Sequence, residues 1–202
     1  MTIAVLAAQD AFDTLTSMAP ALTWKPITEL SSIEDAHALF CLDEAADERD
    51  YRGIAIPVFL HSVVKPLQAI YHSGSAIRIN AWNGFLNRSL WEVAGTLSTG
   101  HLDVLSALSR TYKQVPDEPG FVAARVIAMI INEAYMALEE GVSSKADIDI
   151  AMKLGTNYPM GPFEWADAVG IQSVYKLLQS LSKKDTRYTP AKALEAAATS
   201  HD

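Results

Sequence analysis

The stretch from Pro119 to Gly141 constrains the fold of this chain more than any other part of the sequence. Pro119 suits the first turn of a helix, and Gly141 suits a left-handed cap at its end. The first half of this helix is apolar on nearly every side, so it has to be buried against more than one neighbour. A second copy of the chain can supply part of that cover, so we expect a homodimer formed through the 118–140 helix.

Residues before Val115 follow a different pattern from those after it. Short apolar runs alternate with helix-forming segments, which is typical of βαβ units and a mostly parallel sheet. We expect strands at residues 3–7, 22–27, 37–42, 54–60, 75–81 and 90–94. We expect helices at residues 9–18, 43–50, 63–72 and 101–112. The sequence therefore predicts an α/β domain over residues 1–115, followed by an all-α domain over residues 116–202.

The all-α region carries its own start and stop signals. Ser144, followed three residues later by Asp147, predicts a capping box at a helix start, and this helix should run to Gly155. Proline and glycine at residues 159–162 predict a rigid turn, after which two further helices follow. We expect a short final helix at residues 191–198.

The composition excludes several classes of partner. The chain has 24 acidic and 16 basic residues, and its net charge of -8 opposes binding to nucleic acid or to an anionic membrane surface. No apolar run approaches the roughly 18 residues that a membrane span needs, and no secretory signal is indicated, so we expect a cytoplasmic protein. The single cysteine, Cys41, rules out an intrachain disulfide, and the scattered histidines form no metal-ligand pattern.

Residues 119–170 carry a set of motifs in an unbroken order. These are the PGF entry, NEA in the long helix, EEGV at its end, DIDIAMKLG in the next helix and the YPMGPFE turn. This string closely resembles the start of the C-terminal domain of 3-hydroxyacyl-CoA dehydrogenases. The resemblance implies that the helical domain pairs two subunits and supplies one wall of an acyl-CoA cleft. It also implies a preceding Rossmann domain that binds NAD and carries most of the chemistry.

The segment at the place of the NAD-binding turn departs from the family pattern, which is G-x-G-x-x-G. Ala7, Gln9 and Phe12 stand where the glycines are expected, and side chains there crowd the path of the pyrophosphate. Asp10 adds a negative charge where a diphosphate would lie, and Glu29 is a poor candidate for holding the ribose. We therefore expect a degenerate, shortened Rossmann-like domain in which no residue is assigned to NAD binding.

Only 118 residues precede Pro119, fewer than the resemblance implies. A full six-stranded, doubly wound sheet is therefore not expected to fit.

The resemblance also implies a histidine base that is oriented by a glutamate. Within residues 76–95, Glu92 falls at the position of the glutamate, while Arg78 or a residue beside it occupies the position of the base. Arginine stays protonated near neutral pH and cannot accept the proton. We therefore expect Arg78 to form a salt bridge with Glu92.

Two further positions bear on the substrate. Ala124 stands where the resemblance implies an asparagine that polarises the substrate carbonyl, so this donor is absent. Ser62 either retains a catalytic serine at a strand end or caps the helix that follows. Glu133, inside the apolar helix, is interpreted as a hydrogen-bonding group across the dimer.

Three interpretations follow from these residues. The coincident loss of glycines, histidine and asparagine favours a divergent family member that keeps the dimer and an acyl-CoA site but lacks hydride transfer. The alternative is an active NAD-dependent 3-hydroxyacyl-CoA dehydrogenase of fatty-acid metabolism with a rebuilt site, in which Glu92 is the base. The third is a non-catalytic interaction subunit that docks onto a complete dehydrogenase in a mixed dimer.

Overall fold

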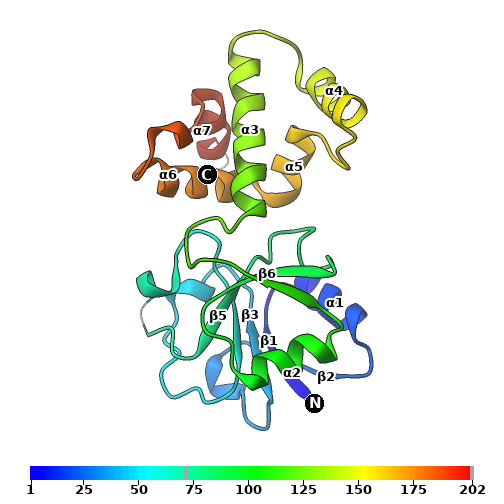
Figure 1. Cartoon of the computed structure of the whole chain (residues 1–202), viewed down its shortest axis with the longest axis vertical. Helices are drawn as coiled ribbons and strands as arrows, with labels where there is room; N and C mark the ends of the chain where they lie inside the picture. Colours follow the sequence, from blue (N-terminus) through cyan, green and yellow to red (C-terminus); the bar gives the residue numbers. More distant parts are fainter. Residues whose placement is uncertain (71, 201–202) are drawn as a thin grey trace. The chain divides into compact units, whose positions relative to one another are not determined.

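A computed structural model describes residues 1–70 and 72–200, and the chain divides into two compact units, Met1–Phe121 and Val122–Asp202 (Figure 1). The sequence placed the change of character near Val115. The segment between these positions stays with the N-terminal unit because Arg78 binds Asp117 and the Gly120 amide donates to the Val63 carbonyl at 2.7 Å.

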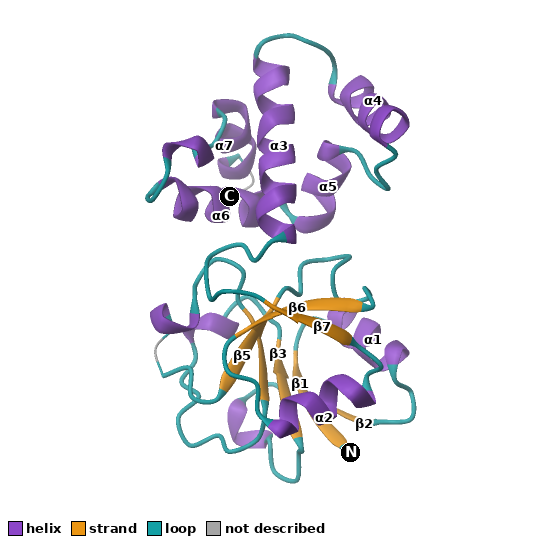
Figure 2. Cartoon of the chain, viewed as in Figure 1, coloured by secondary structure: helices purple, strands orange, loops and turns teal. Residues whose placement is uncertain are grey.

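A single seven-stranded sheet forms the N-terminal unit, in the order β2-β1-β3-β4-β5-β6-β7 (Figure 2). Its neighbouring strands are parallel except for β5 and β6, which are antiparallel. This confirms the predicted α/β domain with a mostly parallel sheet. The strands are β1 Thr2–Leu6, β2 Thr23–Pro26, β3 Ala38–Cys41, β4 Val58–His61, β5 Ala76–Ile79, β6 Leu90–Ala94 and β7 Thr111–Gln114.

The unit is short because most connections between its parallel strands lack a full helix, and not because strands are missing. The full helices of this unit are α1, Gln9–Met18, and α2, Thr99–Ala107. The helices predicted at 43–50 and 63–72 are wrong, because their described residues contain only short 3-10 turns at Ala46–Glu48 and Leu67–Ala69. A sheet of seven strands therefore fits into this short unit, although its β2–β3, β3–β4 and β4–β5 connections contain no α-helix in their described residues.

The predicted helix at 43–50 fails because its charged residues pair at the wrong spacing for a helix. Asp43 and Arg49 form a two-pronged ion pair at 2.5 Å, six residues apart, whereas helical partners lie three or four residues apart. The Tyr51 hydroxyl donates to the carbonyl of Ala46 at 2.5 Å and closes the same loop.

Alternation along the central strands divides the core between the two faces of the sheet. Ile3 and Val5 of β1 belong to one apolar cluster, which includes residues of α1 and α2, and Ala4 and Leu6 belong to the other. Phe40 and Phe59, on neighbouring strands, stack with their ring centres 4.5 Å apart. Burial on both faces explains why β3 is apolar at every position and why its neighbours β1 and β4 are apolar at all but one.

The C-terminal unit is helical, as predicted. Its helices are α3 Ala123–Glu139, α4 Lys145–Thr156, α5 Pro162–Val169, α6 Ile171–Ser182 and α7 Lys192–Thr199, with a 3-10 turn at Thr186–Tyr188. The predicted place of Pro119 in the first turn of the long helix is wrong, because Gly120 and Phe121 have φ of +87° and +49° and delay its start. The left-handed cap at Gly141 (φ +68°) is confirmed. Of the predicted capping box, the Ser144 half is confirmed, since its hydroxyl accepts from the Asp147 amide at 3.2 Å, whereas the Asp147 carboxylate accepts from the Ser144 hydroxyl at 2.6 Å.

Two residues in the family-like motifs of this unit, Asp149 and Asn132, form hydrogen bonds that hold its helices together. Asp149 of α4 accepts hydrogen bonds from the amides of Phe163 and Glu164, at 2.8 and 3.3 Å, and so caps the start of α5. Asn132 of α3 donates to the Thr189 carbonyl at 3.0 Å and accepts from the Ala191 amide at 2.8 Å. None of the helices within the described ranges combines the length and the apolar character that a bilayer span needs.

Candidate functional site

The turn from β1 to α1 contains no glycine, and its side chains pack against the core or bond to neighbouring residues. Ala8 is the N-cap of α1, and the Asp10 carboxylate accepts the Ala11 amide at 2.8 Å. Ala7 and Phe12 are partly buried and pack against the core, whereas Gln9 is exposed and bonds to Asp13. Amides at the start of a helix can bind a phosphate, but at the start of α1 the Asp10 carboxylate already binds one of them.

A hollow of about 110 Å³ lies between the start of α1 and residues 81–87, and its lining includes Asp10, Asn83 and Asn87. Pockets for ligands of cofactor size commonly measure about 300–1,000 Å³. The hollow by itself is smaller than such pockets. The absence of glycine and the carboxylate of Asp10 mean that this turn does not match the G-x-G-x-x-G pattern.

Two polar residues directly follow adjacent strands, and a third lies within the next strand. In the antiparallel pair, Ile79 of β5 lies opposite Val93 of β6, so the next step of this register brings Asn80 opposite Glu92. In the parallel pair, His61 of β4 lies beside Ile79, so Ser62 follows beside Asn80. The sheet thus aligns Ser62, Asn80 and Glu92 on neighbouring strands, and Asn80 holds the position facing the glutamate.

Asn80 was not singled out from the sequence, which placed the missing base at Arg78 or beside it. Asn80 is 8 % exposed, and its Oδ1 accepts the Trp82 amide at 3.1 Å. Its Nδ2 has no hydrogen-bond partner among the residues that the structure describes. The signal that could have identified Asn80 is its position two residues beyond Arg78, but using it required the β5–β6 register.

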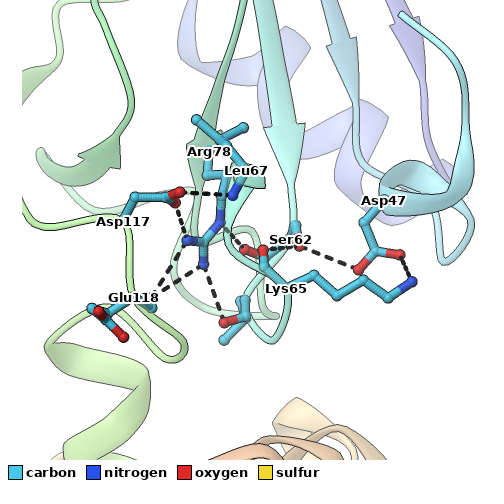
Figure 3. Close-up of polar contacts among 8 residues, drawn as sticks. Asp47, Ser62, Lys65, Leu67, Arg78, Asp117 and Glu118 are labelled. Carbon is cyan, nitrogen blue, oxygen red and sulfur yellow. Dashed lines mark hydrogen bonds and ion pairs between the residues drawn. The ribbon is translucent and has the colours of Figure 1, made fainter. Parts of the chain in front are cut away.

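Arg78 is completely buried and joins two segments of the N-terminal unit (Figure 3). Its Nη1 binds Asp117 Oδ1 at 2.5 Å, its Nε donates to the Ser62 carbonyl at 2.8 Å, and its guanidinium lies 4.7 Å from the centre of the Phe121 ring. The expected salt bridge to Glu92 is therefore wrong, because Asp117 is the carboxylate that pairs with Arg78. Burial lowers the pKa of Arg78, and Asp117 opposes that shift.

Ser62 closes a turn at the end of β4. It is buried, and its Oγ lies 2.7 Å from the Lys65 carbonyl and 3.2 Å from Asp47 Oδ2, while Lys65 Nζ binds Asp47 Oδ1 at 2.9 Å (Figure 3). Ser62 does not cap a helix, because the next helical turn after it is a short 3-10 turn that begins only at Leu67. A catalytic role for Ser62 stays a prediction.

His61 is a neutral group at the same end of the sheet. Its Nδ1 accepts the Ala81 amide at 3.1 Å, so it helps to hold the chain where β5 ends. Desolvation lowers the pKa of His61 to about 4. The ring therefore carries no charge near neutral pH.

Two other sequence-based predictions concern substrate and metal binding. Ala124 is completely buried in the first turn of α3 and offers no side-chain donor. Within residues 1–70 and 72–200, no group of histidine, cysteine, aspartate or glutamate side chains is arranged to hold a metal ion.

An apolar groove of about 690 Å³ runs along α3 in the C-terminal unit. Its lining includes Val126, Met129 and Ile130, and the charged residues Arg125 and Glu133 also line it. Val126 is 52 % exposed, and Val122, one turn earlier, is 56 % exposed. The most apolar helix of the chain thus leaves one face uncovered.

Residues 120–201 match the family model described as 3-hydroxyacyl-CoA dehydrogenase, C-terminal domain. The C-terminal unit belongs to this domain family. Over 92 residues the chain is 45 % identical to the 3-hydroxyadipyl-CoA dehydrogenase of Escherichia coli K12, covering 45 % of this chain and 19 % of that protein. Over 93 residues it is 41 % identical to the 3-hydroxybutyryl-CoA dehydrogenase of Clostridioides difficile, covering 43 % of this chain and 33 % of that protein. The chain thus spans at most a third of the length of these curated relatives.

Solved structures extend the likeness in fold to both units. The FadB2 structure of M. tuberculosis has a TM-score of 0.78 at 15 % identity, covering 98 % of this chain and 93 % of that one. The (S)-3-hydroxybutyryl-CoA dehydrogenase PaaH1 of Ralstonia eutropha has a TM-score of 0.71 at 20 % identity, with the same coverage. At these identities the likeness supports the fold alone, an α/β unit followed by a helical unit.

Proposed function

We propose that this chain is a self-associating protein related to the 3-hydroxyacyl-CoA dehydrogenases that binds an acyl-CoA thioester and does not transfer hydride to or from NAD. The observation that carries this proposal is the β1–α1 turn, where the Asp10 carboxylate binds the Ala11 amide. A pyrophosphate needs free amides and a positive field at this place. Asp10 occupies an amide and adds repulsion instead.

The strand ends support the same proposal. The position facing Glu92 holds the neutral amide of Asn80, which cannot accept a proton near neutral pH. Arg78 is held by Asp117 and the Ser62 carbonyl, away from any acid–base role. The residues at this edge can bind and orient an oxygen-containing ligand, but the base that the family reaction uses is missing.

Isothermal titration tests the proposal directly. We expect 3-hydroxybutyryl-CoA and acetoacetyl-CoA to bind and NAD and NADH to give no heat of binding, because the Asp10 carboxylate already binds the Ala11 amide at the start of α1. CoA alone is the control for binding through the nucleotide part of the thioester. Nicotinamide binding in the micromolar range would contradict the proposal.

A second candidate is an active, NAD-dependent 3-hydroxyacyl-CoA dehydrogenase in which Glu92 is the base. The comparisons by themselves favour this candidate, because the curated relatives described above are named as dehydrogenases. It requires NADH oxidation in the presence of acetoacetyl-CoA. It also requires that Glu92→Gln abolish this activity, and unchanged turnover in that variant would remove Glu92 as the base.

A second copy of the chain is the proposed occupant of the α3 groove. Arg125 and Glu133 line the groove eight residues apart, which is about 12 Å along a helix. A two-fold axis that crosses α3 would place Arg125 of one copy against the oppositely charged Glu133 of the other. The charges and the exposed valines thus support a homodimer over an unrelated partner.

Val126→Asp is expected to convert this dimer into a monomer at micromolar concentration, because it buries a carboxylate in an apolar interface. Sedimentation velocity measures the change. Leu102→Asp is the matched control, since Leu102 is an exposed apolar residue on α2 in the other unit. A wild-type chain that sediments as a monomer would contradict the homodimer, and one that associates only with a complete dehydrogenase would support the mixed dimer.

A further inference from the structure

We infer that helix α2 is released from the sheet by acid, through protonation of His101 in its first turn. Helix α2 starts with a capping box in which Ser98 is the N-cap and His101 follows three residues later. Glutamate or glutamine is usual at the second of these places. A histidine there titrates near neutral pH, so the cap of α2 responds to acid where a glutamine would not.

The cap requires the neutral form of the ring. His101 Nδ1 accepts the backbone amide of Ser98 at 3.1 Å, and the Ser98 Oγ lies 2.8 Å from the same nitrogen. Ser98 Oγ in turn accepts the His101 amide at 3.4 Å. Because Nδ1 accepts from a backbone amide, it carries no hydrogen, and the proton of the ring belongs on Nε2.

The ring of His101 is completely buried between α2 and β4. Its centre lies 5.3 Å from that of Phe59 on β4, in an edge-to-face arrangement. Nε2 faces the Val58 carbonyl without forming a hydrogen bond within the described part of the chain. A Cβ at Gly100 would lie 2.5 Å from Pro57 Cγ, so the first turn of α2 packs directly against the segment before β4. A charge on the ring would therefore have no water around it while α2 stays in place.

Protonation of the buried ring has several unfavourable consequences. A hydrogen on Nδ1 would meet the Ser98 amide, which is also a donor, so this amide would lose its acceptor. The positive charge would lie at the amino end of a helix, where the helix dipole is positive as well. Desolvation lowers the pKa of His101, and the Val58 carbonyl is the group that opposes this shift. The acidic form is therefore stable only once α2 has moved away.

Charged groups on the elements packed around the ring do not compensate this cost. Asp103, the other titratable residue of α2, is exposed. Strand β7, which contacts α2, carries Tyr112 and Lys113, and both are exposed. Cys41 of β3 belongs to the apolar cluster on the opposite face of the sheet, and His61 lies at the far end of β4.

The pH dependence has a definite direction. The closed helix holds the neutral ring, so its stability is complete above the ordinary histidine pKa of about 6.5 and decreases as the pH falls below that value. Opening then takes up one proton, and each pH unit raises the ratio of open to closed helix by up to about tenfold. Opening exposes Val104 and Leu105, which are each 1 % exposed in the closed helix.

Amide hydrogen exchange of the whole chain at about pH 7.5 and about pH 5.5, corrected for the intrinsic effect of pH on exchange, tests this inference. We expect the protection of the α2 amides to fall about tenfold in the wild type, relative to the amides of β1 and β4. His101→Gln retains an acceptor for Ser98 that does not titrate, so its α2 protection should stay constant. His37→Gln is the matched control, because His37 Nδ1 also accepts a backbone amide, that of Thr2 at 3.1 Å, but His37 is exposed.

Two results would overturn the inference. One is an equal loss of α2 protection in the wild type and in His101→Gln. The other is an equal loss in α2 and in the central strands, which would mean that acid unfolds the unit as a whole. Should His101→Gln not fold, magnetic resonance of the wild type provides a second test. The Ser98 amide resonance should titrate together with the His101 ring, and a constant Ser98 resonance beside a titrating ring would also overturn the inference.

Discussion

Asp117→Ala is expected to lower the free energy of unfolding of the N-terminal unit by about 3 kcal/mol, because it leaves a buried guanidinium without a counter-charge. Arg78 is completely buried, while the side chain of Asp117 is 27 % exposed at the edge of the interaction. The same carboxylate also accepts the Leu67 amide at 2.8 Å. The substitution therefore removes a carboxylate that accepts hydrogen bonds from two separate segments, through the Leu67 amide and the Arg78 side chain.

Urea unfolding followed by tryptophan fluorescence measures this effect. The four tryptophans include Trp165 in the C-terminal unit, so a Trp165→Phe background makes the signal report on the N-terminal unit alone. Asp50→Ala is the control, because it breaks an exposed ion pair with Arg52 and should leave the midpoint unchanged.

A double replacement separates the ion pair from packing at the same place. In Arg78→Met with Asp117→Leu, neither charge remains, so the loss should be smaller than in Asp117→Ala. A double variant that is less stable than the single one would contradict the role of Asp117 as the counter-charge of Arg78.

The role of Arg78 shows how the sheet edge is organised. By binding the carbonyls of Ser62 and Val63 as well as Asp117, it ties the turn after β4 to the segment that ends the N-terminal unit. An arginine that looked like a replacement for a catalytic base in the sequence is therefore a structural link. The position that faces Glu92 is left to Asn80.

Local signals predicted much of the fold correctly. The strand at 90–94, the first helix and the Ser144 cap depend on residues close in sequence, and all three were predicted. Strand β7 was missed because its four residues are exposed and carry no apolar pattern, so that only pairing with β6 defines it. The failed helix at 43–50 depends on the Asp43–Arg49 pair, which propensity does not reveal.

The candidate site was less predictable for a related reason. Glu92 and Ser62 were identified because the family resemblance assigned them places along the chain. Asn80 and Asp117 acquire meaning only from the arrangement across strands, since Asn80 comes one residue after the Ile79–Val93 pair and Asp117 lies 39 residues from Arg78. Residues that act through register or through a distant ion pair leave no local pattern to read.

Gly161→Ala is expected to destabilise the C-terminal unit by about 3 kcal/mol, through overpacking and loss of a helix cap. A Cβ at this position would lie 2.3 Å from Cγ and 2.4 Å from Cβ of Asp149. Because even the Asp149 Cβ is too close, rotating its carboxylate away does not relieve the clash. Asp149 would have to leave the amides of Phe163 and Glu164 that it binds.

A second glycine of the same unit provides the matched control for this prediction. Gly155 lies in α4, and a methyl group added to its Cα would meet nothing within 4 Å, so Gly155→Ala should stabilise the unit by about 0.5–1 kcal/mol through helix propensity. Thermal unfolding followed by the helical circular dichroism signal compares both variants with the wild type. Opposite shifts would mean that the glycine of the YPMGPFE motif is required by the Asp149 cap, and a neutral Gly161→Ala would remove that explanation of the motif.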